Sequence, residues 1–244
     1  MQANRRRNFL LHAGLTLAAA AAGGWPLLAP AAGDAPLKIG IIGAGRIGGT
    51  LGELWLKAGH QVMFSSLDLE QDRALAARLG GAAQAGTPAE AAAFGEILLI
   101  SVPYAALPQL GRDLADSMKG KIVLDTCNPI PARDGDMALE AKAKGSGLVS
   151  PLLLPGTRLV RAFNSVGYAK LRSEAHRAGE RVAIPLAGDD DAALQVAARL
   201  VREAGFDAVL AGSLARAKEF DPGTAAFGKA LTAPELRQVL GINP

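Results

Sequence analysis

Short apolar runs alternate along the chain with longer stretches in which apolar residues recur every three or four positions. The runs predict β-strands at 39–42, 62–64, 97–102, 121–125, 159–163, 181–187 and 206–210, and the periodic stretches predict helices at 46–57, 69–79, 88–94, 104–118 and 189–204. Because the middle runs are apolar throughout, they are typical of strands buried on both faces of a sheet. The alternation predicts an α/β fold with a doubly wound, mostly parallel sheet. The stretch 129–155, rich in Pro and Gly, predicts a loop over the ligand cleft.

The first predicted strand leads into a glycine pattern, Gly43-Ala44-Gly45-Arg46-Ile47-Gly48. Gly43 permits a tight turn, Gly45 lets the backbone approach a pyrophosphate, and Gly48 lets the next helix pack against the strand. That helix directs its free N–H groups and the positive end of its dipole at the phosphates. Because the pattern stands between a predicted strand and a predicted helix, it predicts a Rossmann-type domain that binds a dinucleotide through all six residues.

The residues after the second strand favour NADP(H) over NAD(H). NAD-binding domains carry an Asp or Glu there, which accepts hydrogen bonds from the ribose 2′-hydroxyl. This chain has Ser65 and Ser66, whose hydroxyls can donate to a 2′-phosphate, and Arg46 could reach that phosphate or the pyrophosphate. Leu67 and Asp68 add no cation, so the choice between NADP and NAD stays open. In a second interpretation, one of the serines caps the next helix.

Three loops that follow predicted strands should meet at the cleft, since ligands of such sheets bind beyond the carboxyl ends of the strands. Val102 and Pro103 follow one strand, Asn128 follows the next, and Asn164 and Ser165 follow a third. We expect Val102, Pro103 and Asn128 to contact the cofactor, and Asn164 and Ser165 to be the catalytic residues. Either asparagine could bind the nicotinamide carboxamide or the substrate. In the alternative interpretation both are ordinary turn residues.

Few side chains suited to proton transfer accompany these loops. We expect His60 in a solvated turn, and Cys127, the one cysteine of the chain, as a small buried hydrophobe. His176 is a candidate for substrate binding at the mouth of the cleft, and Lys218 and Lys229 are candidates for binding an acidic substrate tail. Nowhere do residues have the spacing of metal ligands, so we expect no metal site.

The N-terminus has the order basic, apolar, small that is typical of an export signal. Arg6 and Arg7, followed by Asn-Phe-Leu, fit the twin-arginine pattern of the bacterial pathway that exports folded proteins, and Ala29-Pro30-Ala31 suits a cleavage site. We therefore expect residues 1–31 to be a signal peptide and the protein to be periplasmic, with an uncleaved membrane anchor as the alternative. Removing 1–31 takes away three of the 26 Lys and Arg residues and none of the 23 Asp and Glu. The remaining chain is formally neutral, which gives no support for nucleic-acid binding.

Seven segments together cover nearly all of the chain after the predicted signal: IGIIGAGRIGGTLG, AGHQVMFSS, ISVPYAALPQL, VLDTCNPIP, VRAFNSVGYAKL, IPLAGDDDAA and LARAKEFDPGTAAFGKALT. They resemble the NADPH-dependent reductases of the deazaflavin coenzyme F420 and their bacterial relatives. The resemblance implies a Rossmann-type domain, which we place at 36–212, and a small C-terminal extension at 213–244 that covers the cleft. It also implies hydride transfer from NADPH to an isoalloxazine-like ring stacked on the nicotinamide.

By this resemblance the pyrophosphate is contacted by Ala44, Gly45, Arg46 and Ile47, the 2′-phosphate by Ser66, and the substrate by Asn164 and Ser165. The family generally has an arginine after the serine, and Leu67 in its place would weaken NADP selectivity. The sequence thus predicts an NADP(H)-dependent oxidoreductase that acts on a deazaflavin or flavin-like acceptor and is exported, cofactor bound, by the twin-arginine machinery. The alternatives are an exported reductase of another small electrophile with tightly bound NADP(H), and a non-catalytic nucleotide-binding protein. A homodimer is one option for its assembly.

Overall fold

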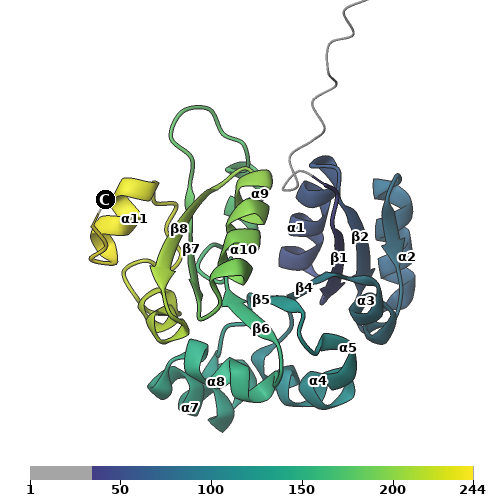
Figure 1. Ribbon diagram of the computed structural model, residues 1–244, viewed down its shortest axis with the longest axis horizontal. Helices are drawn as coiled ribbons and strands as arrows, with labels where there is room; N and C mark the ends of the chain where they lie inside the picture. Colours follow the sequence, from purple (N-terminus) through teal and green to yellow (C-terminus); the bar gives the residue numbers. More distant parts are fainter. Residues whose placement is uncertain (1–34, 244) are drawn as a thin grey trace, which may run out of the picture. The chain divides into compact units, whose positions relative to one another are not determined.

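One eight-stranded sheet runs through residues 35–243, the part of the chain that the computed structural model describes (Figure 1). The strands are β1 (Lys38–Ile42), β2 (Gln61–Ser65), β3 (Ala83–Ala85), β4 (Ile97–Ile100), β5 (Ile122–Asp125), β6 (Arg158–Arg161), β7 (Ala183–Gly188) and β8 (Asp207–Gly212). Their order is β3-β2-β1-β4-β5-β6-β7-β8, and neighbouring strands are parallel except β6 and β7. The predicted α/β fold with a mostly parallel sheet is confirmed. The strand order reverses between β1 and β4, which is where such sheets bind ligands.

Helices cover both faces of this sheet because strand side chains point alternately to the two sides. They are α1 (Arg46–Lys57), α2 (Leu69–Leu79), α3 (Pro88–Phe94), α4 (Leu107–Asp113), α5 (Ala115–Met118), α6 (Pro131–Asp134), α7 (Asp136–Lys144), α8 (Ser146–Leu153), α9 (Tyr168–Ser173), α10 (Asp191–Glu203) and α11 (Ala233–Val239). Ile39 and Ile41 belong to the core under α1, α2 and α10, whereas Ile42 and Leu98 belong to the core on the other side, with α4 and α8. The apolar runs therefore supply two cores.

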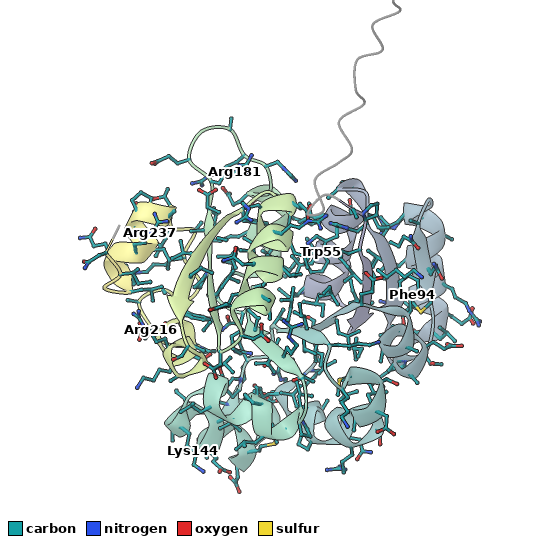
Figure 2. All side chains as sticks on the ribbon, in the orientation of Figure 1. Trp55, Phe94, Lys144, Arg181, Arg216 and Arg237 are labelled. Carbon is teal, nitrogen blue, oxygen red and sulfur yellow. The ribbon has the colours of Figure 1, made fainter. Side chains whose placement is uncertain are left out.

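Trp55 is the largest buried side chain and joins α1 to α10 (Figure 2). Its indole N–H donates to the carbonyl oxygen of Leu200 at 2.9 Å, and its ring meets Phe163 edge to face with centroids 6.0 Å apart. Phe163 directly precedes Asn164, one of the predicted site residues. The packing under α1 therefore fixes the backbone that enters the site.

The prediction of a loop at 129–155 is wrong, because this stretch forms α6, α7 and α8. Gly135 and Gly145, at φ of 66° and 96°, separate three short helices and do not mark a continuous loop. The segment between them is rich in Ala, Leu, Glu and Lys, which favour helix. The single helix expected at 104–118 is instead divided into a 3₁₀ turn, η1 (Tyr104–Ala106), and the helices α4 and α5.

The prediction that His60 is solvated is also wrong. The side chain is buried, its Nδ1 accepts a hydrogen bond from the Leu37 N–H at 3.0 Å, and its Nε2 lies 2.9 Å from Glu203 Oε2. The turn that carries His60 is covered by the end of α10, which the local sequence does not reveal. We assign His60 a structural role.

The segment after β8 packs against the outer end of the sheet. It contains the 3₁₀ helix η2 (Leu214–Phe220) and α11, whose apolar side chains form a third core with β7 and β8. Between these two helices the chain turns back to the cleft, where the Gly228 N–H donates to the Ser165 carbonyl oxygen at 2.7 Å. Within residues 35–243 we find no helix that is long and apolar enough to cross a membrane. The predicted signal peptide lies outside the described residues.

Candidate functional site

The glycine loop between β1 and α1 is held by backbone hydrogen bonds to β2. The N–H groups of Gly43 and Ala44 both donate to the carbonyl oxygen of Ser65, at 2.8 and 2.9 Å. Gly43 has φ of 101°, and a β-carbon on it would lie 2.2 Å from the Ser101 carbonyl oxygen. A β-carbon on Gly45, in contrast, would meet no atom within 4 Å. The loop is therefore packed on its inner side and open on the side where a ligand can approach.

Helix α1 begins at this open side without a side-chain cap. Gly45 is its N-cap and makes no side-chain hydrogen bond to the first turn, which also contains no acidic residue. The free N–H groups of such a helix start are suited to bind an anion. The observed geometry fits a pyrophosphate, as the glycine pattern predicts.

A cavity of about 420 Å³ lies on one side of the loop, between the ends of β2 and β4. Its walls are mainly apolar and include Leu67, Pro88, Val102, Pro103 and Leu110. Such a slot suits a flat purine ring, because apolar surfaces can cover both of its faces. We call it the adenine-side cavity.

Of the two serines at the end of β2, one is buried and the other lines the cavity. Ser65 is fully buried, and its hydroxyl donates to the Ile41 carbonyl oxygen at 2.7 Å, so its side chain supports the loop and does not face the cavity. Ser66 lines the cavity, and its hydroxyl donates to Asp72 Oδ2 at 2.8 Å. The interpretation that a serine caps the next helix is wrong, since Asp68 is the N-cap of α2 and accepts from the Gln71 N–H.

Two further cavities continue along the carboxyl ends of β5 and β6. One, of about 250 Å³, is lined by Arg46, Ile47, Val102, Pro103 and Asn128, and some of these residues also line the cavities on either side of it. The other, of about 410 Å³, is the acceptor-side cavity, and its lining includes Ile47, Asn128, Asn164, Tyr168, Lys170 and Phe227. The structure thus brings the loops after β4, β5 and β6 together around the glycine loop. Ser165 is buried behind this surface.

The two asparagines of these loops contact each other. Asn128 Nδ2 donates to the carbonyl oxygen of Asn164 at 2.8 Å, and Asn164 Nδ2 lies 3.3 Å from Asn128 Oδ1. Asn164 is 4% exposed, and within the described part of the chain its Oδ1 has no hydrogen-bond partner. A buried amide oxygen without a partner is costly, so Asn164 is well suited to receive a hydrogen bond from a ligand.

A buried ion network lies beneath the asparagines. Arg161 is fully buried, and its Nη1 is 2.8 Å from Asp125 Oδ2 while its Nη2 is 3.2 Å from Asp221 Oδ1. Nη1 also donates to the Cys127 carbonyl oxygen at 2.7 Å. Burial lowers the pKa of Arg161, but the two carboxylates more than reverse this, so the guanidinium stays charged. The network joins β5, β6 and the C-terminal segment at the base of the site.

The residues of the site that were not predicted from the sequence are Tyr168, Lys170, Arg133 and Phe227. The ring of Tyr168 lies 4.9 Å from the guanidinium of Arg46, and Lys170 Nζ donates to the Gly228 carbonyl oxygen at 2.7 Å. Arg133 donates to the Asn128 carbonyl oxygen at 2.9 Å, and it was hidden by the wrong loop prediction. Phe227 comes from the C-terminal segment, far away in sequence. Arg133 could have been found from its position, since a basic residue five positions after Asn128 is close enough to reach the cofactor side of that loop.

The remaining candidates lie away from the cavities just described. His176 donates its backbone N–H to Gly205, in the turn before β8, and Lys218 and Lys229 line none of these three cavities. Cys127 is buried, as predicted, and burial raises the pKa of its thiol well above the usual value. A buried thiol with a raised pKa is a poor nucleophile. Among residues 35–243 no three metal-ligating side chains come together.

Residues 38–129 match the family described as NADP oxidoreductase coenzyme F420-dependent. The match covers the nucleotide-binding half of the described chain. The resemblance seen in the sequence is confirmed, and the family consists of NADP-dependent oxidoreductases. No curated protein gives a significant sequence match.

Solved structures share the fold at low sequence identity. A hypothetical protein from Sinorhizobium meliloti is 24% identical with a TM-score of 0.71, over 81% of this chain and 96% of that one. A candidate F420-dependent NADP-reductase from Arthrobacter sp. FB24 is 20% identical with a TM-score of 0.65, over 80% and 99% of the two chains. An imine reductase from Myxococcus stipitatus in complex with NADP+ is 19% identical with a TM-score of 0.54, over 75% of this chain and 57% of that one. These likenesses support the Rossmann-type fold.

Proposed function

We propose that the protein transfers a hydride between the nicotinamide of NADP(H) and a planar acceptor of the flavin or deazaflavin class. The observation that carries this proposal is the acceptor-side cavity of about 410 Å³, which adjoins the nucleotide cleft and shares Ile47 and Asn128 with it. A second molecule bound there would lie directly beside the reactive end of the cofactor. The family match over residues 38–129 supports the cofactor, and the resemblance of the sequence segments to coenzyme F420 reductases supports the acceptor.

The residues present fit a dinucleotide laid across the glycine loop. The adenine-side cavity would hold the base, the start of α1 would hold the pyrophosphate, and Val102 with Asn128 would border the nicotinamide. This placement follows the rule that ligands bind at the switch point, beyond the carboxyl ends of the strands. Pro103, directly after Val102, stiffens the loop at the middle of the cleft.

The acceptor-side cavity suits a reaction that needs orientation more than acid or base catalysis. Its described lining contains neither a carboxylate nor a histidine, and its titratable side chains are Tyr168 and Lys170. NADPH would supply the hydride, and two stacked rings exchange it without an enzymic base. Phe227 and Tyr168 offer aromatic surface for a planar ring, and the asparagine pair offers hydrogen bonds along its edge.

Asn164 would position one of the two rings through its unpaired Oδ1. That atom can accept from a carboxamide N–H or from a ring N–H, whereas its Nδ2 lies near Asn128 Oδ1 and the Phe220 carbonyl oxygen, both at 3.3 Å. The protein thus presents an acceptor of fixed orientation. Ser165 would act through its backbone, because its carbonyl oxygen binds Gly228 and its side chain is buried.

Hydride transfer can be tested directly with NADPH deuterated at C4 of the nicotinamide. The full chain is mixed with a synthetic deazaflavin, whose C5 keeps the transferred deuterium, and the label is sought in the reduced acceptor by mass spectrometry. With riboflavin or FMN, whose N5–H exchanges with water, the anaerobic oxidation of NADPH and reduction of the flavin are followed by absorbance instead. We expect reduction of at least one of these acceptors, and Asn164→Ala should slow it strongly while Gln109→Ala, at an exposed position of α4, should not. Failure to reduce any acceptor, with NADPH binding intact, would contradict the proposal.

We also propose that the protein is exported through the twin-arginine pathway. The Arg6-Arg7 motif supports this, as does the fold itself, since a domain that binds its cofactor in the cytoplasm must be exported folded. Fusion of residues 1–35 to a reporter should give export that requires the twin-arginine translocase and is lost when both arginines become lysine. Export that persists with two lysines would show that another route is used.

A further inference from the structure

The end of β2 is acidic where a 2′-phosphate would require positive charge. Asp68 is the charged residue among the described residues that line the adenine-side cavity. Asp72 lies one turn further along α2, buried beneath Ser66. In Rossmann-type domains the ribose 2′ position falls at this strand end. A phosphate there would add about −1.5 to −2 charges beside two carboxylates.

The hydrogen bonds of Ser66 have a fixed polarity. Its hydroxyl donates to Asp72 Oδ2 at 2.8 Å, and its oxygen accepts from the Asp68 N–H at 3.1 Å. Because the hydroxyl hydrogen is engaged by a carboxylate, Ser66 can offer a ligand only its oxygen lone pair. A ribose 2′-hydroxyl can donate to that lone pair, whereas a phosphate oxygen cannot.

Two basic residues near the subsite have other partners. Arg73 Nη1 pairs with Glu70 Oε1 at 2.6 Å on the exposed side of α2. Arg46 stacks on Tyr168 in a separate cavity between α1 and α2 and does not line the adenine-side cavity. Leu67 stands fully exposed between Ser66 and Asp68 and brings no charge. The subsite therefore has a hydroxyl partner and lacks a phosphate partner among its described residues.

We propose that this subsite accepts a ribose 2′-hydroxyl at least as well as a 2′-phosphate, so that the protein binds NAD(H) no less tightly than NADP(H), with Asp72 acting through Ser66 as the positioning residue. The inference rests on the dinucleotide placement proposed above. It makes the protein an oxidoreductase that accepts both cofactors.

The surroundings of Asp72 agree with this assignment. Burial raises the pKa of its carboxyl group, opposed by the hydrogen bond from Ser66, and the nearby Asp68 raises it further. A phosphate beside this carboxyl group would raise its pKa further, which costs binding free energy. A neutral hydroxyl has no such cost and can be oriented by Asp72 through Ser66.

The test is equilibrium titration of the full chain with NADH and with NADPH, followed by the fluorescence of the reduced nicotinamide. We expect the dissociation constant for NADH to be equal to or below that for NADPH. Asp72→Asn removes the negative charge beneath Ser66, so it should favour NADPH over NADH by about tenfold relative to the wild type. Glu70→Gln removes a charge from the same helical turn without contact to Ser66 and should change the ratio by no more than about twofold.

A second variant changes an exposed residue, so it does not require the fold to accept a substitution at a buried position. Leu67→Arg places a guanidinium at a fully exposed site beside the 2′ position and should tighten NADPH by about tenfold to a hundredfold while leaving NADH unchanged. Tighter binding of NADPH than of NADH by the wild type would overturn the inference, as would equal shifts in Asp72→Asn and Glu70→Gln. These readouts use binding alone, so their failure is distinct from a failure of hydride transfer to the proposed acceptors.

Discussion

The two halves of the cleft are held in place by different interactions. On the adenine side, backbone hydrogen bonds hold the loop, because the N–H groups of Gly43 and Ala44 donate to the carbonyl oxygen of Ser65. Glycines let β1, α1 and the loop after β4 pack closely there. On the nicotinamide side, Arg161 and its two carboxylates connect β5, β6 and the C-terminal segment through side chains that are buried and charged. We therefore expect the first half to be most sensitive at its glycines and the second at a few buried ions.

Loss of Arg161 should have the largest effect. Arg161→Met leaves Asp125 and Asp221 without their buried cation, and breaking such a network from one side costs about 3–5 kcal/mol. Urea unfolding should show this loss of free energy. Arg158→Met is the matched control on the same strand, since Arg158 pairs with Asp190 at the surface and should lose no more than about 1 kcal/mol. Similar losses in both variants would mean that burial of the network does not matter.

The glycines should separate stability from binding on the adenine side. A β-carbon on Gly48 would lie 2.2 Å from the Gly43 carbonyl oxygen, so Gly48→Ala should destabilise the fold by about 1–3 kcal/mol. A β-carbon on Gly45 meets no protein atom, so Gly45→Ala should leave the free energy of unfolding nearly unchanged. It should nevertheless weaken NADPH binding about tenfold or more, because the added methyl group occupies the approach to the pyrophosphate. Unchanged NADPH affinity in Gly45→Ala would place the pyrophosphate elsewhere.

Loss of Lys170 should weaken binding of the acceptor more than binding of the cofactor. Its ammonium group holds the Gly228 carbonyl oxygen at 2.7 Å, which keeps Phe227 at the edge of the acceptor-side cavity. Lys170→Met should cost about 1 kcal/mol of stability and raise the KM for the acceptor severalfold, with the NADPH dissociation constant unchanged. Lys144→Met, on the exposed face of α7, serves as the control. A parallel rise in the NADPH dissociation constant would show that the contact serves the whole cleft.

The same contrast explains what the sequence could predict. The glycine loop, α1 and β2 lie within about thirty consecutive residues, so their spacing alone indicates both structure and ligand. Asn128 and Asn164 were predictable because the carboxyl ends of parallel strands share an edge. Phe227 was not, because a contact with the C-terminal segment leaves no local pattern. The prediction that His60 is solvated was wrong for the same reason, since its partner Glu203 lies 143 positions away in the sequence.

The smallest effect that we predict is the pH dependence of the stability that Asp134 gives to the loop after β5. Burial works to raise the pKa of Asp134, but hydrogen bonds from Arg133 and from the Ile130 and Ala105 N–H groups together lower it below its usual value of 3.8. A lowered pKa in the fold favours the ionised form, so Asp134 contributes stability above that value and loses it as the pH falls through the folded pKa. Urea unfolding of Asp134→Asn should show a loss of about 1 kcal/mol or less at neutral pH, and the difference from the wild type should shrink in acid. A difference that stays constant down to about pH 2 would mean that the carboxylate charge does not hold this loop.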